Sequence, residues 1–263
     1  MVILELRAVS KRFGGVQALE QVDFVGTAGE VHGLIGPNGA GKSTLIGCIT
    51  GVNRIDAGEI ALRDRRIDRL PVHQRARLGV SRTFQKIRLA QSLTVFENVA
   101  IGLASQQLAG ASGYLRLFAP RSLDGLAHAV GEALEAAGIA DIAAETVASL
   151  PYGTRHFVEI ARALVSAPHV LLLDEPATGL TDAERERLGA LVRGVAAAGR
   201  LVVLVEHDLA LVGKLCDRVT VLEYGRRIFT GTPAAAQDNE QVITAYLGSA
   251  RLARDEGSNA EAH

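Results

Sequence analysis

The sequence predicts an α/β fold with a mostly parallel sheet, an N-terminal antiparallel β subdomain and an inserted helical subdomain. Continuous apolar runs at 170–173 and 201–205 are typical of strands buried on both faces of a parallel sheet, and the short, mainly apolar stretch at 31–35 also has a strand pattern. Residues 2–30 instead alternate apolar and polar side chains between glycine breaks, which indicates short antiparallel strands. Residues from about 92 to 165 show helical periodicity without a strand pattern, so we expect helices inserted between two halves of the core.

Length and composition suit one large globular domain. The chain has 263 residues, of which 48% are hydrophobic and 22% charged. We expect this domain to span 1–248 and a polar, disordered tail to follow at 249–263. The net charge of -1 gives no overall attraction to nucleic acid, so we expect no nucleic-acid partner. Cys48 and Cys216 lie far apart without ligand spacing, which disfavours a disulfide framework or a zinc site.

No stretch of the sequence has the pattern of a membrane anchor. The first residues are charged too soon for a signal peptide. No apolar run approaches the ~20 residues that a membrane-spanning helix needs. We therefore expect a soluble chain, for which any role at a membrane requires a partner that spans it.

The strongest motif fits the phosphate-binding pattern G-x-x-x-x-G-K-[S/T]. It is the run Gly36-Pro37-Asn38-Gly39-Ala40-Gly41-Lys42-Ser43. A strand pattern precedes it, and Thr44 opens a helical pattern towards Thr50, a context that disfavours a chance glycine turn. The glycines let backbone N–H groups point inward around phosphate oxygens, and the helix N-terminus adds partial positive charge. Lys42 would reach the terminal phosphates, and the Ser43 hydroxyl would bind Mg2+.

One aromatic residue and one glutamine are weaker candidates for the nucleotide site. Phe13, in a polar and glycine-bounded stretch, fits strand core and a flat surface for a nucleotide base about equally. Gln85 follows the end of an expected strand, where a lone glutamine is usually a surface residue. Between them, the arginines from Arg63 to Arg77 are interspersed with aspartates, which predicts a solvated face.

The helical region contains one clear start signal and one candidate anion site. Thr94 and Glu97 have capping-box spacing, and a second helix is expected over 123–137. A further helix is expected from about Arg155 to Ser166. Gly153 and Thr154 precede it and are a candidate anion site, although the residues alone favour a plain helix start.

Two carboxylates emerge where the buried strand at 170–173 ends. Parallel sheets bind ligands at this edge. Beside a phosphate loop, Asp174 suits Mg2+ ligation, and Glu175 suits orienting or deprotonating an attacking water. The alternative is a helix N-terminal charge pair. His207 leaves the next buried strand at the same edge, although a lone histidine is more often structural. Thr181 is expected to cap a helix over 182–198.

In their order and spacing these motifs resemble the ATP-binding subunits of ABC transporters, from residue 2 to about 248. The resemblance assigns a role to each motif. It implies adenine stacking on Phe13, ATP phosphates on 36–44, and a link between Mg2+, water and a transmembrane subunit at Gln85. It also implies a signature at 150–154, Mg2+ and water contacts at Asp174 and Glu175, a dimer-contacting loop at 177–182, and a switch histidine at His207.

The signature departs from the family's usual Leu-Ser-Gly-Gly-Gln. Pro151 replaces the serine, Tyr152 the first glycine and Thr154 the glutamine. Backbone N–H groups from Gly153 onward would still bind phosphate. This Leu-Pro-Tyr-Gly form is similar to that of importers of branched-chain amino acids and related amides, as are the segments 105–121 and 242–248.

The resemblance implies an ATPase of α/β, P-loop type that powers import of a small solute. Two such subunits would pack head to tail with ATP and Mg2+ between them, using Lys42, Gln85, Glu175 and His207 in hydrolysis. We expect a serine-bearing second subunit, transmembrane permease subunits, an indirect link to a solute-binding protein, and a peripheral position on the cytoplasmic face of the inner membrane.

Other interpretations stay open at this point. Subunits for urea transport or lipopolysaccharide export are close relatives within the family. A soluble ABC ATPase of DNA repair or translation usually carries two cassettes or long insertions, which are not evident here. A P-loop kinase or GTPase is disfavoured by the signature and His207, and a non-hydrolysing ATP-binding module by Glu175 and His207.

Overall fold

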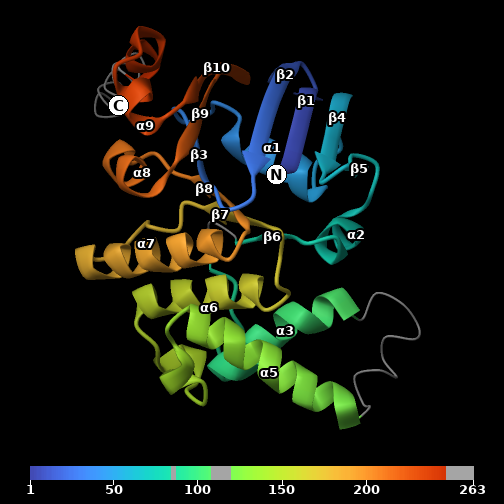
Figure 1. Cartoon of the computed structure of the whole chain (residues 1–263), viewed down its shortest axis with the longest axis vertical. Coiled ribbons are helices and arrows are strands. Elements are labelled where there is room, and N and C mark those ends of the chain that lie inside the picture. Colours follow the sequence, from blue (N-terminus) through green and yellow to red (C-terminus); the bar gives the residue numbers. More distant parts are fainter. Residues whose placement is uncertain (84–86, 108–119, 247–263) are drawn as a thin grey trace, which may run out of the picture.

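The computed structural model describes residues 1–83, 87–107 and 120–246. Two sheets form its frame (Figure 1). An antiparallel sheet has the strand order β2-β1-β4-β5, and a larger sheet has the order β10-β9-β3-β8-β7-β6. The strands are β1 (Val2–Phe13), β2 (Val16–Thr27), β3 (Val31–Ile35), β4 (Ala57–Leu62), β5 (Arg65–Arg66), β6 (Val80–Arg82), β7 (Val170–Asp174), β8 (Leu201–Val205), β9 (Arg218–Glu223) and β10 (Arg226–Gly231).

The antiparallel sheet is built on two long strands rather than short ones. β1 and β2 have 12 residues each, so the predicted direction is confirmed and the predicted length is wrong. The register between them shifts at several points, and Ala8 and Gln21 have positive φ values of 47°. Such bulges interrupt the apolar alternation without ending a strand. Gly26 lies inside β2, where a Cβ would overlap the Leu201 side chain of the other sheet.

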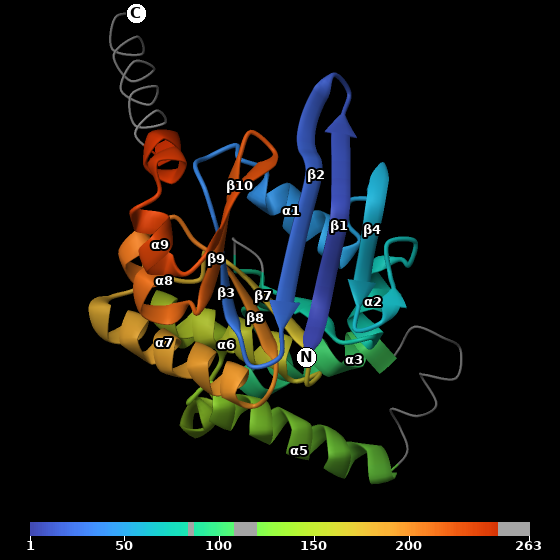
Figure 2. The same ribbon diagram turned by 45° about the horizontal axis from the view of Figure 1, so that its top comes forward.

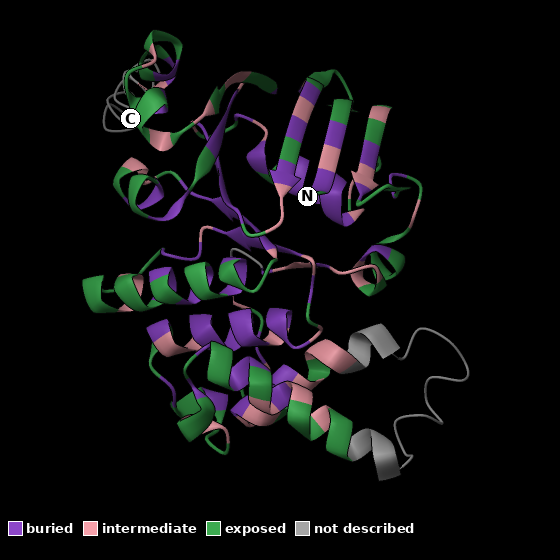
Figure 3. Cartoon of the chain, viewed as in Figure 1, coloured by how far each residue is buried: buried purple, intermediate pink, exposed green. Residues whose placement is uncertain are grey.

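The larger sheet has a parallel core, as the apolar runs predict. β3 pairs in parallel with β8 and β9, and β7 pairs in parallel with β6 and β8. β3, β7 and β8 are buried along their whole length (Figure 3). Their side chains alternate between two hydrophobic clusters: Leu172 and Val203 face one cluster, and Leu171 and Val202 face the other.

The helices occupy the two faces of this parallel core. They are α1 (Lys42–Thr50), α2 (Val72–Arg77), α3 (Val95–Gln107), α5 (Pro120–Ala136), α6 (Tyr152–Leu164), α7 (Asp182–Ala197), α8 (Leu209–Leu215) and α9 (Pro233–Gln237), with short 3-10 turns at Ala140–Ile142 and Val147–Ser149. α1 shares its hydrophobic cluster with the antiparallel sheet (Figure 2), whereas α6 and α7 share the other cluster with α3 and α5. In the described residues, no helix combines the length and apolar character that spanning a membrane requires.

The helix starts follow local capping chemistry. Thr181 and Glu184 form the capping box of α7, and Thr94 and Glu97 exchange hydrogen bonds in the same way at α3. α6 begins at Tyr152, three residues before the predicted start, because the helix already includes the glycine and threonine that follow. Predictions for the tail at 249–263, and for most of 105–121, fall outside the described residues.

One arginine of the expected solvated face is buried, so that prediction is wrong for Arg75. Only 2% of the residue is exposed. Its guanidinium donates to the carbonyl oxygens of Cys48 (2.5 Å) and Ile49 (2.9 Å) near the end of α1, and to those of Leu70 and Asp68 (both 2.8 Å). A cation at this end complements the helix dipole and satisfies terminal carbonyls. Arg75 therefore anchors the far end of the helix that begins at the phosphate-binding motif.

We expect Arg75→Met to lower the melting temperature by on the order of 5–10 °C, because it leaves buried carbonyl oxygens without their charged donor. Thermal denaturation monitored by circular dichroism measures this. Arg77→Met is the matched control, since Arg77 lies exposed on the same helix; an equal loss in both variants would contradict the anchoring role.

Candidate functional site

The phosphate-binding motif forms a tight loop between β3 and α1. Gly36 has φ 144°, and a Cβ there would overlap the carbonyl oxygen of Leu222. Gly41 has φ 102°, and a Cβ there would lie 2.7 Å from the carbonyl oxygen of Ala18. Backbone atoms of the neighbouring strands therefore lie so close to the loop that a side chain at either position would displace it. The loop is held in a conformation that requires glycine.

Lys42 reaches back over this loop. Its ammonium donates to the carbonyl oxygens of Gly36 (2.6 Å) and Pro37 (2.9 Å), and the residue is buried. Burial lowers the pKa of Lys42, while the nearby carboxylates of Glu175 and Asp174 raise it. A buried ammonium held by carbonyl dipoles is placed to exchange them for the stronger charge of a phosphate.

The other residues of the motif differ in exposure. Ala40 is buried, Pro37 and Thr44 are half-buried, and Asn38 and Gly39 are exposed. The Ser43 side chain is exposed directly after Lys42. The backbone N–H of Gly225, in the turn between β9 and β10, donates to the carbonyl of Ala40 at 3.0 Å and braces the loop.

The two predicted carboxylates lie at the C-terminal end of β7, as the strand pattern indicates. Asp174 is buried, and burial raises its pKa while Arg82 and Lys42 lower it. Glu175 has φ 50°, a left-handed conformation that is costly for a residue with a side chain. Its N–H donates to the Val205 carbonyl at 3.0 Å, which fixes this bend against β8. The bend takes Glu175 out of regular strand geometry directly after Asp174, the last residue of β7.

Two neighbours of Asp174 were not singled out from sequence. The Arg82 guanidinium lies 3.6 Å from the Asp174 carboxylate, and the Thr83 hydroxyl accepts a 3.3 Å hydrogen bond from the Asp174 N–H. Arg82 ends β6 and Thr83 follows it, two residues before Gln85. Gln85 itself lies outside the described residues. The pairing of β6 with β7, which sets Arg82 opposite Leu172, is the feature that would have identified Arg82 as a neighbour of Asp174.

His207 follows β8 at the same edge, with 61% of its side chain exposed. The residue before it, Glu206, is buried and accepts a 3.2 Å hydrogen bond from the Ala177 N–H. Burial raises the pKa of Glu206, and this hydrogen bond lowers it. Glu206 therefore ties the histidine segment to the loop at 177–182, a link that sequence reasoning missed.

The signature segment lies apart from the phosphate loop of its own chain. Pro151 precedes α6, and Gly153 packs against the carboxylate of Glu184 at the start of α7. The Tyr152 ring, 55% exposed, lies against Gly179. α6 and α1 belong to opposite faces of the parallel sheet (Figure 1), so Gly153 and Thr154 lie on the other side of the sheet from α1.

Phe13 lies at the end of β1 and is 47% exposed. The Lys11 ammonium is 5.2 Å from the centre of its ring. Of the two sequence-based interpretations, strand core is therefore wrong, and a flat accessible ring is what the structure presents.

A residue near the C-terminus also touches the phosphate loop. Burial raises the pKa of Tyr246 to about 12, and a backbone hydrogen bond from Gly36 acts against that rise. On the same helical stretch, Val242 and Ile35 line one small apolar cavity. The sequence had marked this segment only as a subgroup feature.

The site's chemistry fits a nucleotide with Mg2+. The glycine cradle and Lys42 suit phosphate oxygens, and the Ser43 hydroxyl and Asp174 carboxylate are oxygen ligands of the kind Mg2+ prefers. In the described ranges, no three His, Cys, Asp or Glu side chains cluster as a self-sufficient metal site. Mg2+ here would share its ligands with substrate phosphates, as is usual for this ion.

Comparisons with known proteins show the family to which the chain belongs. The ABC transporter family matches residues 19–178, and the C-terminal family of branched-chain amino acid ATP-binding cassette transporters matches 226–251. The high-affinity branched-chain amino acid transport ATP-binding protein LivG of Salmonella typhimurium is 38% identical over 253 residues, covering 94% of this chain and 98% of LivG. BraF of Pseudomonas aeruginosa, which carries the same description, is 37% identical over 255 residues, with the same coverage.

Solved structures show the same relation. The ADP conformation of MJ1267, an ATP-binding cassette of an ABC transporter, superposes with a TM-score of 0.84 at 27% identity, covering 94% of this chain and 99% of that one. A nucleotide-free cassette from an ABC transporter has a TM-score of 0.82 at the same identity and coverage. The chain therefore belongs to the ABC transporter family, as an ATP-binding cassette whose ATPase activity is coupled to transport.

Proposed function

We propose that this chain binds Mg-ATP on the loop at 36–44 and uses its hydrolysis to drive import of a small solute. The observation that carries the proposal is the meeting of Lys42, Asp174 and Glu175 at one edge of the parallel sheet. In this proposal Lys42 leaves the loop carbonyls to bind the terminal phosphates. Ser43 and Asp174 hold Mg2+, which neutralises charge on the phosphates, and Gln85 completes this set.

The remaining site residues have complementary roles. Glu175 orients the attacking water and accepts its proton, and its bent backbone aims the carboxylate out of the strand. His207 contacts the terminal phosphate from the neighbouring strand end. Phe13 offers its exposed ring to the adenine. The loop around Gly36 supplies N–H groups to the phosphates.

A second cassette completes each nucleotide site. Gly153 and Thr154 would cover the phosphates held by the other subunit, because they face away from the loop of their own chain. Closed pairs then bind ATP more tightly than separated ones, and hydrolysis removes that preference. Pro151 supplies no hydroxyl for the partner's phosphate. We therefore propose that the second subunit is a different chain with a serine at this position.

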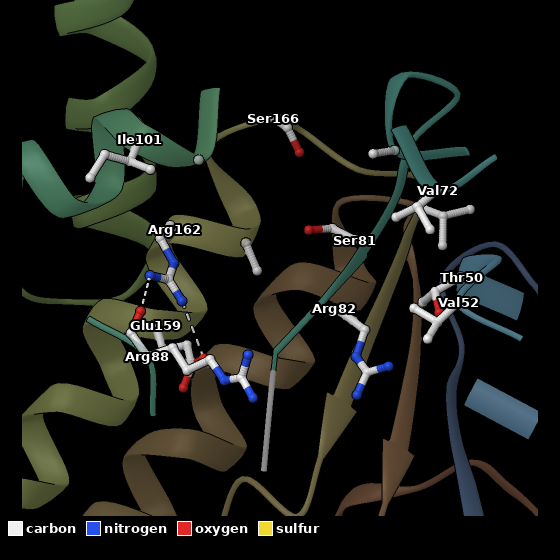
Figure 4. Close-up of a pocket in the computed structure, with 14 residues that line it drawn as sticks. Thr50, Val52, Val72, Ser81, Arg82, Arg88, Ile101, Glu159, Arg162 and Ser166 are labelled. Carbon is white, nitrogen blue, oxygen red and sulfur yellow. Dashed lines mark hydrogen bonds and ion pairs between the residues drawn. The ribbon is translucent and has the colours of Figure 1, made fainter. Parts of the chain in front are cut away.

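The permease subunits dock in a cleft of about 400 Å3 between α2 and β6 on one side and α3 and α6 on the other (Figure 4). Val72 and Ile101 are 46% and 44% exposed on opposite walls. Exposed apolar side chains facing each other across a groove are suited to a partner helix. The partner would thereby touch the chain beside Gln85. We propose that the docked subunit lies on the cytoplasmic face of the inner membrane.

The cargo we propose is a branched-chain amino acid or a related amino acid or amide, delivered by a solute-binding protein. LivG and BraF, named for branched-chain amino acid transport, support this assignment. Purification of the membrane complex and uptake assays with its permease subunits test it. Uptake of leucine, isoleucine or valine that depends on this subunit is the expected result, and uptake of an unrelated solute alone would overturn the cargo assignment.

We expect Glu175→Gln to bind ATP with near-native affinity and to release phosphate at least about a hundredfold more slowly, because the amide cannot accept the proton. Nucleotide binding and phosphate release are measured on the same preparation. Turnover close to that of the native protein would assign the base to another residue.

We expect Lys42→Ala to weaken ATP binding by at least about tenfold, since it removes the buried cation that faces the phosphates. Equilibrium titration with a fluorescent ATP analogue measures the loss. Lys214→Ala, which removes an exposed lysine from α8, is the control and should bind normally. Equal affinity in the Lys42 variant and its control would refute the phosphate site.

The heterodimer is tested by reconstitution with the permease subunits. We expect this chain alone to give less than about a tenth of the ATPase activity that a serine-bearing second cassette restores, because the nucleotide held by this chain then meets a serine hydroxyl. Full activity with two copies of this chain would contradict the heterodimer.

A further inference from the structure

We infer that Arg82 is a positioning residue that neutralises the Asp174 carboxylate until Mg2+ binds and then moves away from it. The inference rests on the proposed Mg2+ site at Asp174. The contact that carries it is the 3.6 Å ion pair between the Arg82 guanidinium and the Asp174 carboxylate. Arg82 acts through the metal ligand, and no contact with substrate is assigned to it.

Strand register brings the two residues together. In the parallel pair of β6 and β7, Arg82 is the partner of Leu172. Paired residues in a sheet point to the same face, and alternate residues along one strand share a face. Asp174 stands two residues after Leu172, so its carboxylate and the Arg82 guanidinium project to one face, diagonally across the pair. Leu172 packs in the cluster that contains α1, so this is the face of the phosphate loop.

Without a bound metal ion, the adjacent carboxylates of Asp174 and Glu175 require a nearby positive charge to offset their repulsion. Asp174 and Glu175 are adjacent, and the side chain of Asp174 is 9% exposed. Buried like charges are costly unless countered. Lys42 and Arg82 both favour the ionised Asp174. The Arg82 side chain, 20% exposed, is the counter-charge on the strand side. A divalent ion at the same carboxylate repels this guanidinium and makes it redundant.

The structure leaves Arg82 room to withdraw. The residue also lines the cleft proposed for the permease (Figure 4), where its side chain leaves β6 on the side opposite to Ser81. In this inference the guanidinium turns from Asp174 towards the cleft when Mg2+ binds. By this inference, Arg82 raises the Mg2+ concentration that the site requires, because its positive charge competes for Asp174.

The test measures the Mg2+ requirement of nucleotide binding without turnover. The native chain, R82Q and R82K are titrated with MgCl2 in the presence of a fluorescent ADP, and the half-saturating Mg2+ concentration is read from the fluorescence. Because one competing charge near a divalent ion is removed, R82Q should lower that concentration by about three- to tenfold. R82K keeps the charge and should stay within about twofold of the native chain.

The matched control is Arg185→Gln, which breaks a different arginine–aspartate pair, the 3.0 Å contact with Asp208. Its Mg2+ requirement should equal that of the native chain. An unchanged or higher requirement in R82Q, or the same decrease in the Arg185 variant, would overturn the inference while leaving the proposed function intact. Failure of the native chain to bind ADP at any Mg2+ concentration would overturn both.

Discussion

The interaction on which the site depends is the attraction between one buried ammonium and two adjacent carboxylates. Lys42 follows the phosphate loop at the end of β3, and Asp174 and Glu175 lie at the end of β7. The attraction between these charges therefore requires the sheet to keep β3 and β7 at a constant distance from each other. β8 does this by pairing in parallel with both strands. The burial of all three strands follows from this requirement, because a displaced strand would separate the charges and leave each of them poorly solvated.

The phosphate loop and the signature segment lie on opposite faces of the parallel sheet. α1 and the antiparallel sheet occupy the face of the phosphate loop, and α6 begins the signature on the other face. In the proposed function, the chain presents half of a nucleotide site on each of these two faces. Glu206 and the loop at 177–182 connect these places, since the buried Glu206 carboxylate holds the Ala177 backbone next to the histidine segment. A dimeric arrangement is the simplest way to use both halves.

Much of this could be predicted from sequence, because it depends on local patterns. The apolar runs, the glycine motif and the capping boxes each act within a few neighbouring residues, and the structure has them where the patterns indicate. The parts that could not be predicted depend on contacts between distant segments. Charge spacing does not reveal that Arg75 turns inward, and no pattern shows that Tyr246 meets Gly36. The length of β1 was missed because bulges resemble strand ends in sequence.

The central claim is that the triphosphate of one nucleotide is held where Lys42 meets the two carboxylates. Isothermal titration of the purified native chain with ATP in the presence of Mg2+ tests it most directly. The account predicts saturable binding of one ATP per chain, with weaker binding when Mg2+ is removed by a chelator. Absence of binding, or binding indifferent to Mg2+, would contradict it.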